Sequence, residues 1–244
     1  MITNKILERI RNGEKALGIT MSQPSTEIVE LAGRMGLDFV GLDAQHSPVS
    51  PEMVQEVCRI ADGFGVTVTM RVPDGRESTI LSYLDRGVRE IQIPNLQTRE
   101  EAEALVKYAY FAPKGLRSAT SVRTAFNQKT GDYTQLYAEI NANTVLVPQL
   151  ESITVLENLD DILTVDGIDY FARGPEDMAQ SLGLTGQATH PKVQEAYARI
   201  DEKLHAAGKH WITEFTESVS VLFVVNEAAE ALLKKHGRES QLRW

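Results

Sequence analysis

The chain has 244 residues, of which 42% are hydrophobic and 24% are charged, so it can bury a full core as one or two domains. Its formal net charge of −9 argues against nucleic acids and anionic membranes as partners. The single cysteine, Cys58, favours a reducing compartment such as the cytoplasm, and the sequence shows neither a signal peptide nor an apolar run long enough to cross a membrane.

Predicted strands and helices alternate along most of the chain. We expect strands at residues 16–20, 37–43, 66–72, 89–95, 143–151 and 168–172. We expect helices at residues 25–36, 51–65, 77–87, 98–110, 153–165, 175–183 and 191–208. Three boundaries carry local signals: Ser25 is an N-cap candidate, Pro51 suits a first helical turn, and Thr98 with Glu101 has the spacing of a capping box.

This alternation is typical of parallel βα units, and at least six can be counted. A nucleotide-binding open sheet normally carries a glycine-rich phosphate turn, and the sequence has no GxGxxG motif. Equally spaced units in a chain of this length favour a closed (β/α)8 barrel, which we expect to span residues 1–244 as one domain. Barrel enzymes carry their chemistry at the carboxyl ends of the strands, so the residues that follow each strand matter most.

Polar and charged residues follow five of the predicted strands. Each one alone is explained by a cap, a turn or a surface ion pair, but together they indicate a site at one rim. They are Asp43, Gln45 and His46 after the second strand, Arg71 after the third, Asn95 after the fourth, Glu151 after the fifth, and Arg173, Gly174, Pro175, Glu176 and Asp177 after the sixth.

The types of these residues suggest metal-assisted chemistry. Two carboxylates, Glu151 and Asp177, suit Mg²⁺ or Mn²⁺, which keep coordination positions open for water and substrate, whereas the sequence lacks the histidine and cysteine pattern of a zinc site. Arg71 is suited to an oxyanion or a carboxylate, and His46 is the candidate general base. Backbone N–H groups around Gly174 and Pro175, where a helix begins, are candidates for holding a substrate carboxylate.

Four segments resemble the HpcH/HpaI aldolase family of pyruvate-dependent, metal-requiring 2-oxo-acid aldolases. The resemblance covers roughly residues 12–210, and the order and spacing of the segments make it specific although each motif is weak alone. The segments are STEIVELAGRMGLDFVGLDAQHSP, MRVPDGRESTILSYLDRGVREIQIPNLQTREEAEALV, YFAPKGLRS, and the pair VLVPQLES and GIDYFARGPEDMAQSLGLTGQATHP.

The resemblance implies a role for each matching residue. Glu151 and Asp177 fall on the metal ligands, and the metal (Mg²⁺ or Mn²⁺, with Co²⁺ as a further option) chelates pyruvate and acidifies its methyl group. Arg71 falls on the arginine that contacts the keto oxygen, His46 on the base, and Asp85 on the acid that pairs with that histidine.

The same resemblance implies the substrate contacts. Gly174 and Pro175 fall on the loop that receives the pyruvate carboxylate. Gln149, Asp43 and Gln45 are expected to contact substrate or to order the metal and its waters. The reaction implied is the addition of the pyruvate enolate to an aldehyde, or its reverse, on substrates of the 4-hydroxy-2-oxoheptanedioate or 2-dehydro-3-deoxyglucarate type.

The C-terminal part departs from the family pattern because it is about a dozen residues short. We expect HWITEF to be the seventh strand and VSVLFVV the eighth, with the joining helix nearly absent, so that the barrel is shortened there. NEAAEALLKKHG is amphipathic, and the resemblance implies a homo-oligomer, a hexamer in the family, with the last helix in subunit contacts.

Several interpretations stay open at the level of sequence. Arg173 either recognises an acidic aldehyde or points outward into a salt bridge. The same scaffold also suits a related reaction with an acyl thioester or oxaloacetate, or a non-catalytic oligomeric binding protein. Away from the strand ends, His190 suits a capping or surface position, and His205, His210 and His236 are expected to be solvated.

Overall fold

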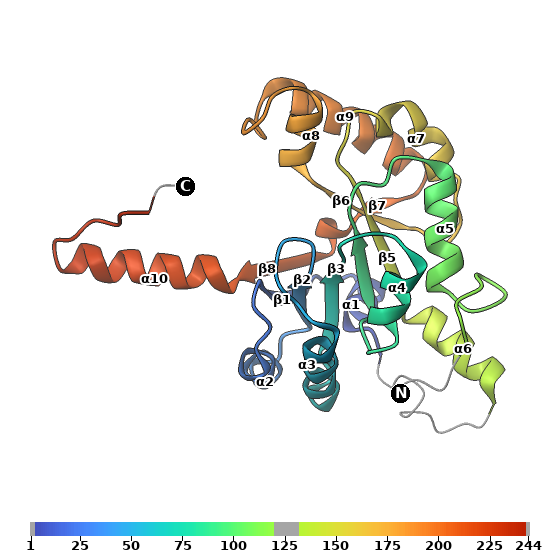
Figure 1. Cartoon of the computed structure of the whole chain (residues 1–244), viewed down its shortest axis with the longest axis horizontal. Helices are drawn as coiled ribbons and strands as arrows, with labels where there is room; N and C mark the ends of the chain where they lie inside the picture. Colours follow the sequence, from blue (N-terminus) through green and yellow to red (C-terminus); the bar gives the residue numbers. More distant parts are fainter. Residues whose placement is uncertain (1–2, 120–131, 243–244) are drawn as a thin grey trace.

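The computed structural model describes residues 3–119 and 132–242. Eight parallel strands form one curled sheet in the order β7-β6-β5-β4-β3-β2-β1-β8 (Figure 1). The strands are β1 (Ala16–Met21), β2 (Phe39–Asp43), β3 (Thr67–Arg71), β4 (Glu90–Ile93), β5 (Val145–Leu150), β6 (Tyr170–Arg173), β7 (His210–Trp211) and β8 (Thr216–Ser220). The predicted (β/α)8-type fold, shortened near its last units, is confirmed, but the predicted closure of the barrel is wrong, because β7 and β8 end the described sheet without pairing with each other.

Most of the helices connect successive strands and cover the outside of the sheet, whereas α1 precedes the first strand and α10 follows the last one (Figure 1). They are α1 (Lys5–Arg11), α2 (Thr26–Met35), α3 (Pro51–Phe64), α4 (Glu77–Leu84), α5 (Arg99–Ala109), α6 (Tyr133–Ala142), α7 (Val155–Leu163), α8 (Pro175–Ser181), α9 (Pro191–Ala206) and α10 (Val221–Lys235). The predicted caps are confirmed: Ser25 accepts a hydrogen bond from the Ile28 N–H, and Thr98 and Glu101 form a capping box.

Two helices were not predicted from the sequence. The first, α1, begins at Asn4, whose side chain caps the N–H groups of Ile6 and Leu7. The second, α6, lies between the fourth and fifth strands, where neither a helix nor a strand was predicted. Ile6 is fully buried among the inward-facing side chains of the strands, so α1 closes the amino-terminal end of the barrel.

Alternation along each strand separates an inner cluster from an outer one. Phe39, Val145, Val147 and Ala172 point inward and pack together, whereas their neighbours in sequence pack against the helices. A Cβ atom at Gly18 would lie 2.5 Å from the Phe39 ring. Glycine there leaves room for Phe39, so the interior of the barrel is packed at the amino-terminal ends of these strands.

The sheet is open between its last two strands. Among the described residues, β7 and β8 are the two ends of the sheet and are not paired with each other. They are joined by one 3₁₀ turn at Ile212–Glu214, so the joining helix is indeed nearly absent. The strand predicted over HWITEF is wrong beyond its first two residues, because the chain turns at that point.

The predicted strand over VSVLFVV is also wrong beyond its second residue. β8 ends at Ser220, and the apolar run from Val221 begins α10, which extends away from the body of the protein (Figure 1). A short apolar run fits a strand or a helix equally well by pattern. No helix within the described residues is both long and apolar enough to cross a membrane.

Candidate active site

A polar cavity of about 260 Å³ lies at the rim of the barrel where the strands have their carboxyl ends. Its position follows from the fold, since parallel strands all end at this rim and the inward residues above the packed core are small or polar. The lining residues include Thr20, Gly41, Asp43, Thr69, Arg71, Gln92 and Ser220. A Cβ atom at Gly41 would lie 2.9 Å from the Thr20 methyl group, so glycine keeps the cavity open.

Asp43 and Arg71 form a two-point ion pair across β2 and β3. Arg71 Nε and Nη2 donate to the two oxygens of Asp43 at 3.1 and 2.5 Å, and the two residues are register partners. Burial by itself raises the pKa of Asp43, but Arg71 and the backbone N–H groups of Gln45 and His46 together hold it below its usual range. Asp43 is therefore an anion that fixes Arg71, and Arg71 Nη1 keeps its donors for a ligand.

Glu151 lies just beyond β5 with only 4% of its surface exposed. One of its oxygens, Oε1, accepts a hydrogen bond of 2.8 Å from the Asn95 N–H. Burial, the largest effect, raises the pKa of Glu151, and the charge of Asp177 raises it further. The Asn95 N–H and the charge of Arg71 lower it, but the net shift is upward. The charges of Asp177 and Arg71 thus reach the carboxylate of Glu151.

Gly174 provides the space in which Glu151 sits. A Cβ atom at Gly174 would lie 1.9 Å from Glu151 Oε2, so only glycine is compatible with this carboxylate position. Glu151 Oε2 therefore occupies the space that the side chain of any other residue at position 174 would fill. Asp177 lies one turn further along α8 and is exposed.

These residues fit a divalent cation. The donors are carboxylate oxygens, which are the ligands that Mg²⁺ and Mn²⁺ prefer. A cation would offset both causes that raise the pKa of Glu151, which are burial of its charge first and the charge of Asp177 second. The prediction that Glu151 and Asp177 are metal ligands is compatible with this geometry and stays a prediction.

The predicted role of Gly174 and Pro175 in holding a carboxylate needs refinement. The Gly174 N–H already donates to Tyr197 Oη at 3.0 Å, and proline has no N–H. Tyr197 in turn donates to the Leu150 carbonyl at 3.1 Å. The loop is thus held by Tyr197, and the N–H groups left for a carboxylate belong to Glu176 and Asp177, in the first turn of α8.

Two glutamines at the rim present unpaired acceptors. Gln149 and Gln45 each have a buried side-chain oxygen that has no hydrogen-bond partner among the described residues. The Gln149 side-chain amide contacts the Arg173 carbonyl at 3.5 Å. Buried acceptors of this kind are normally satisfied by water or a ligand, so both glutamines remain candidates for substrate contacts.

The structure does not bring His46 and Asp85 together within one chain. His46 is exposed in the loop after β2, at the carboxyl rim. Asp85 follows α4 and precedes β4, which places it at the opposite end of the barrel, where it pairs with Arg117 at 2.6 Å. A contact between His46 and Asp85 is therefore not formed within the protomer, because helices and strands of a βα unit run in opposite directions.

Arg173 points outward. Its guanidinium lies 4.6 Å from the centroid of the Trp211 ring and 3.3 Å from an Asp201 oxygen. Of the two alternatives left open by the sequence, the structure supports the outward salt bridge. Arg173 therefore does not contribute a cation to the rim cavity.

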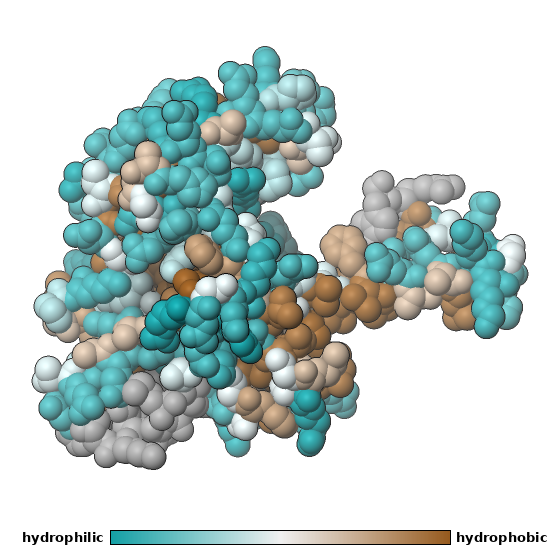
Figure 2. All heavy atoms as spheres, turned by 180° about the vertical axis from the view of Figure 1, so that it is seen from behind, coloured by the Kyte–Doolittle hydropathy of each residue, from teal (hydrophilic) through white to brown (hydrophobic). Residues whose placement is uncertain are grey.

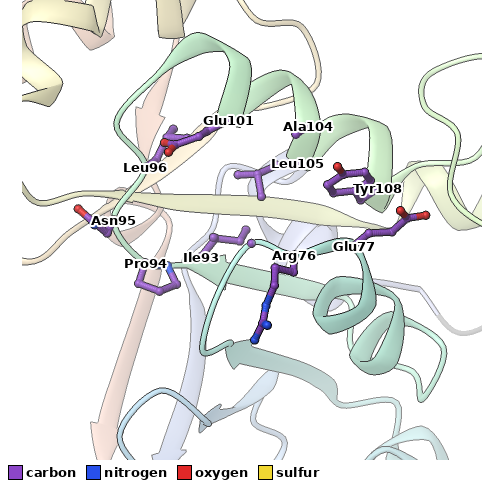
Figure 3. A pocket seen from close by; sticks show the side chains of 11 residues that line it. Arg76, Glu77, Ile93, Pro94, Asn95, Leu96, Glu101, Ala104, Leu105 and Tyr108 are labelled. Atoms are coloured by element: carbon purple, nitrogen blue, oxygen red, sulfur yellow. The ribbon is translucent and has the colours of Figure 1, made fainter.

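A second cavity, of about 420 Å³, lies outside the wall of the barrel (Figure 3). It is bounded by the start of α4, the end of β4 and the face of α5 that carries Leu105 and Tyr108. Asn95 links this cavity to the rim, because it lines the cavity and its N–H donates a hydrogen bond to Glu151. Asp43 and Arg71 line the rim cavity and not this one, so the rim cavity is the candidate active site.

Two supporting residues were missed by the sequence analysis. Tyr197 fixes the Gly174 loop from the buried face of α9, where its tyrosine reads as an ordinary core residue. Asn95 was noted only as a polar strand end, but its backbone N–H holds Glu151, and its φ of 54° is the only positive value among the described non-glycine residues. That left-handed conformation depends on the tertiary structure and leaves no separate signal in the sequence.

Comparisons with known proteins agree with this geometry. The family model described as HpcH/HpaI aldolase/citrate lyase matches residues 19–235. Over 211 residues the chain is 32% identical to a 2-keto-3-deoxy-L-rhamnonate aldolase of Escherichia coli, covering 86% of this chain and 78% of that protein. The fold is similar to a crystal structure of an HpcH/HpaI aldolase from Desulfitobacterium hafniense, with a TM-score of 0.86 and 21% identity over 98% of both chains. It is also similar to the citrate synthase SbnG, with a TM-score of 0.80 and 25% identity over 97% of this chain and 99% of that one.

Proposed function

Because the chain belongs to the HpcH/HpaI aldolase/citrate lyase family, we propose that it makes and breaks the carbon–carbon bond between pyruvate and an aldehyde with the help of a divalent cation. The observation that carries this proposal is the buried carboxylate of Glu151, which lies beside Gly174 and within reach of the charges of Asp177 and Arg71. This combination provides two anionic oxygen ligands and one fixed cation at the same rim.

We place the cation on Glu151 and Asp177, where it would supply Lewis-acid polarisation of a bound 2-oxo acid. Arg71, held by Asp43, offers Nη1 to the keto oxygen and stabilises the negative charge that develops there. The N–H groups at the start of α8 receive the carboxylate. His46, which is exposed in the loop after β2, moves the proton between the substrate and solvent.

The substrate class we propose is a 2-keto-3-deoxy sugar acid, as in the name of the Escherichia coli relative. Retro-aldol cleavage of such an acid gives pyruvate and a hydroxyaldehyde. The unpaired oxygens of Gln45 and Gln149 suit hydroxyl donors on this substrate, whereas Arg173 is occupied outside the barrel and offers no charge to an acidic aldehyde.

The test is exchange of the pyruvate methyl protons in D₂O, followed by NMR. We expect exchange that requires Mg²⁺ or Mn²⁺, stops on addition of a chelator, and is lost in Glu151→Gln. A His46→Ala variant should lose on the order of 10²-fold in kcat, as expected for the removal of a general base. Full exchange in Glu151→Gln, or none with any divalent cation, would overturn the proposal.

The similarity to the citrate synthase SbnG supports a second candidate, condensation with an acyl thioester or oxaloacetate. Arg173 was the residue that favoured an additional carboxylate, and its outward salt bridge removes that support. Release of free thiol from a thioester, with no cleavage of 2-keto-3-deoxy acids, would favour this candidate over the aldolase.

We also propose that the protein is a homo-oligomer assembled through α10. The helix has no buried residue, and its first turns expose Leu222, Val224 and Val225. Figure 2 shows an apolar surface that continues from the body of the protein onto this helix. The exposed Leu17 of β1 and Val219 of β8 lie where a covering helix is expected, so the helix of another subunit fits there.

A further inference from the structure

A second group of ligand-type side chains lies far from the rim, around the short strand β7. His205 is in the last turn of α9, His210 begins β7, and Glu214 ends the 3₁₀ turn. Among the described residues this is the one group of three or more histidine, cysteine or acidic side chains whose ligand atoms all lie within 4.8 Å. Since His210 pairs with Tyr170 at the start of β6, the group lies at the amino-terminal end of the barrel.

The ligand atoms of this group lie close enough together to bind one cation. His205 Nε2 lies 2.9 Å from Glu214 Oε1, and His210 Nδ1 lies 3.1 Å from Glu214 Oε2. In a tetrahedral zinc site with bonds of about 2.0 Å, neighbouring ligand atoms are about 3.3 Å apart. All three ligand atoms lie within 4.8 Å of one another, so one cation that replaces these hydrogen bonds can reach all three side chains once they close on it.

The atoms around the group orient the ligands. His205 Nδ1 lies 3.0 Å from the Asp201 carbonyl, which can only accept a hydrogen bond, so Nδ1 donates its proton there. A cation bound to Nε2 would take the place of the proton that Nε2 otherwise shares with Glu214 Oε1 at 2.9 Å. Glu214 Oε1 also accepts a hydrogen bond of 3.0 Å from the Trp211 N–H. At metal sites, the histidine nitrogen that does not bind the metal commonly donates to a carbonyl, and the carboxylate ligand commonly accepts a hydrogen bond.

We propose that His205, His210 and Glu214 form a second metal site, selective for Zn²⁺ or a similar nitrogen-binding transition-metal ion. Two imidazole ligands favour such ions over Mg²⁺, whereas the oxygen donors Glu151 and Asp177 have the opposite preference. The side chains are 33–41% exposed, so the site is open to solvent, and three protein ligands leave a position for water.

The site would act on the shortest strand of the sheet. β7 contributes two residues to an edge of the sheet that has no further strand beyond it in the described structure. A cation bound to all three side chains links the end of α9 to β7 and to the turn that leads into β8. Its expected effect is structural, and it does not require the rim site to be active.

The test uses the full-length protein with saturating Mg²⁺, so that oxygen-donor sites are occupied. Binding of Zn²⁺ is measured by calorimetry, and binding of Co²⁺ by its visible absorption, which reports imidazole ligation and tetrahedral geometry. We expect one Zn²⁺ per chain in the wild type and in Glu151→Gln/Asp177→Asn. We expect His205→Asn and His210→Asn to weaken binding on the order of 10²-fold, at least the effect of losing an outer contact.

His236→Asn is the matched control, because His236 is exposed at the end of α10 and is not part of the group. It should bind Zn²⁺ as the wild type does. The proposal is overturned if His205→Asn/His210→Asn retains wild-type affinity, or if binding disappears in Glu151→Gln/Asp177→Asn instead. Thermal unfolding in a chelator, equal for wild type and the histidine variants, separates ligand loss from misfolding.

Discussion

At the scale of single residues, Gly174 determines where the Glu151 carboxylate can lie. Its φ of −131° is open to any residue, so the requirement for glycine is steric alone. We predict that Gly174→Ala displaces the Glu151 carboxylate and weakens the binding of Mg²⁺ or Mn²⁺ at least tenfold, with a loss of about 1–3 kcal/mol in unfolding free energy from overpacking. Cation titration and chemical denaturation measure the two effects.

Gly63→Ala is the control for this substitution. Gly63 lies on the exposed face of α3, and a Cβ atom there meets no atom within 4 Å. Alanine should stabilise the helix by up to about 1 kcal/mol and leave cation binding unchanged. Equal cation affinity in Gly174→Ala and wild type would mean that Glu151 does not bind the cation.

Asp85 is a second residue whose role depends on its partner. Its pair with Arg117 includes a guanidinium side chain only 1% exposed, and removing one member of a buried pair costs about 3 kcal/mol. We predict that Asp85→Asn lowers the unfolding free energy by about this amount and leaves the pH profile of kcat/KM unchanged. A shifted pH profile in a variant of normal stability would show instead that Asp85 acts on the proton-transfer step, through a contact between subunits.

At the scale of elements, α10 is the helix that the rest of the chain does not cover. We predict that Leu222→Asp/Val225→Asp reduces the oligomer to smaller species in sedimentation velocity, because both side chains are more than half exposed within the protomer and would become buried in an interface. Asn226→Asp, which adds a charge on the same helix, should leave assembly unchanged. Assembly that persists in the double variant would place the interface elsewhere.

At the scale of the whole molecule, the barrel interior contains a carboxyl group that the proposed reaction does not use. Glu90 points inward from β4, and burial raises its pKa from 4.5 to about 8. An acid whose pKa is raised by folding stabilises the protein below its unfolded pKa, and this contribution is lost as the pH rises through the folded value. We predict that wild type loses up to about 1.4 kcal/mol of unfolding free energy per pH unit in this window, relative to Glu90→Gln.

Urea denaturation of wild type and Glu90→Gln at several pH values between 4.5 and about 8 measures the difference in their unfolding free energies. The gap between Glu90→Gln and wild type should widen as the pH rises and then stay constant above the folded pKa. A gap that does not depend on pH would show that Glu90 is ionised in the folded protein.

The sequence by itself determined most of the helices and strands, and also which residues lie at the carboxyl ends of the strands. Strand and helix periodicity are local properties, so six strands and seven helices could be predicted within a few residues, and the direction of parallel strands then brought Asp43, Arg71, Glu151 and Asp177 to one end. The residue types also suggested metal-assisted chemistry, which stays a prediction, because carboxylates, an arginine and a histidine at one rim have few common uses.

Only the tertiary structure decided which of these residues meet and how the barrel ends. Asp85 lies at the end opposite His46, since α4 runs antiparallel to the strands, and Asp43 holds Arg71 through a register that no local pattern encodes. The run after Ser220 became a helix, and His205 and His210, expected to be merely solvated, were brought together with Glu214. These outcomes depend on contacts between distant segments and on closure of the sheet, whose energies a local pattern does not contain.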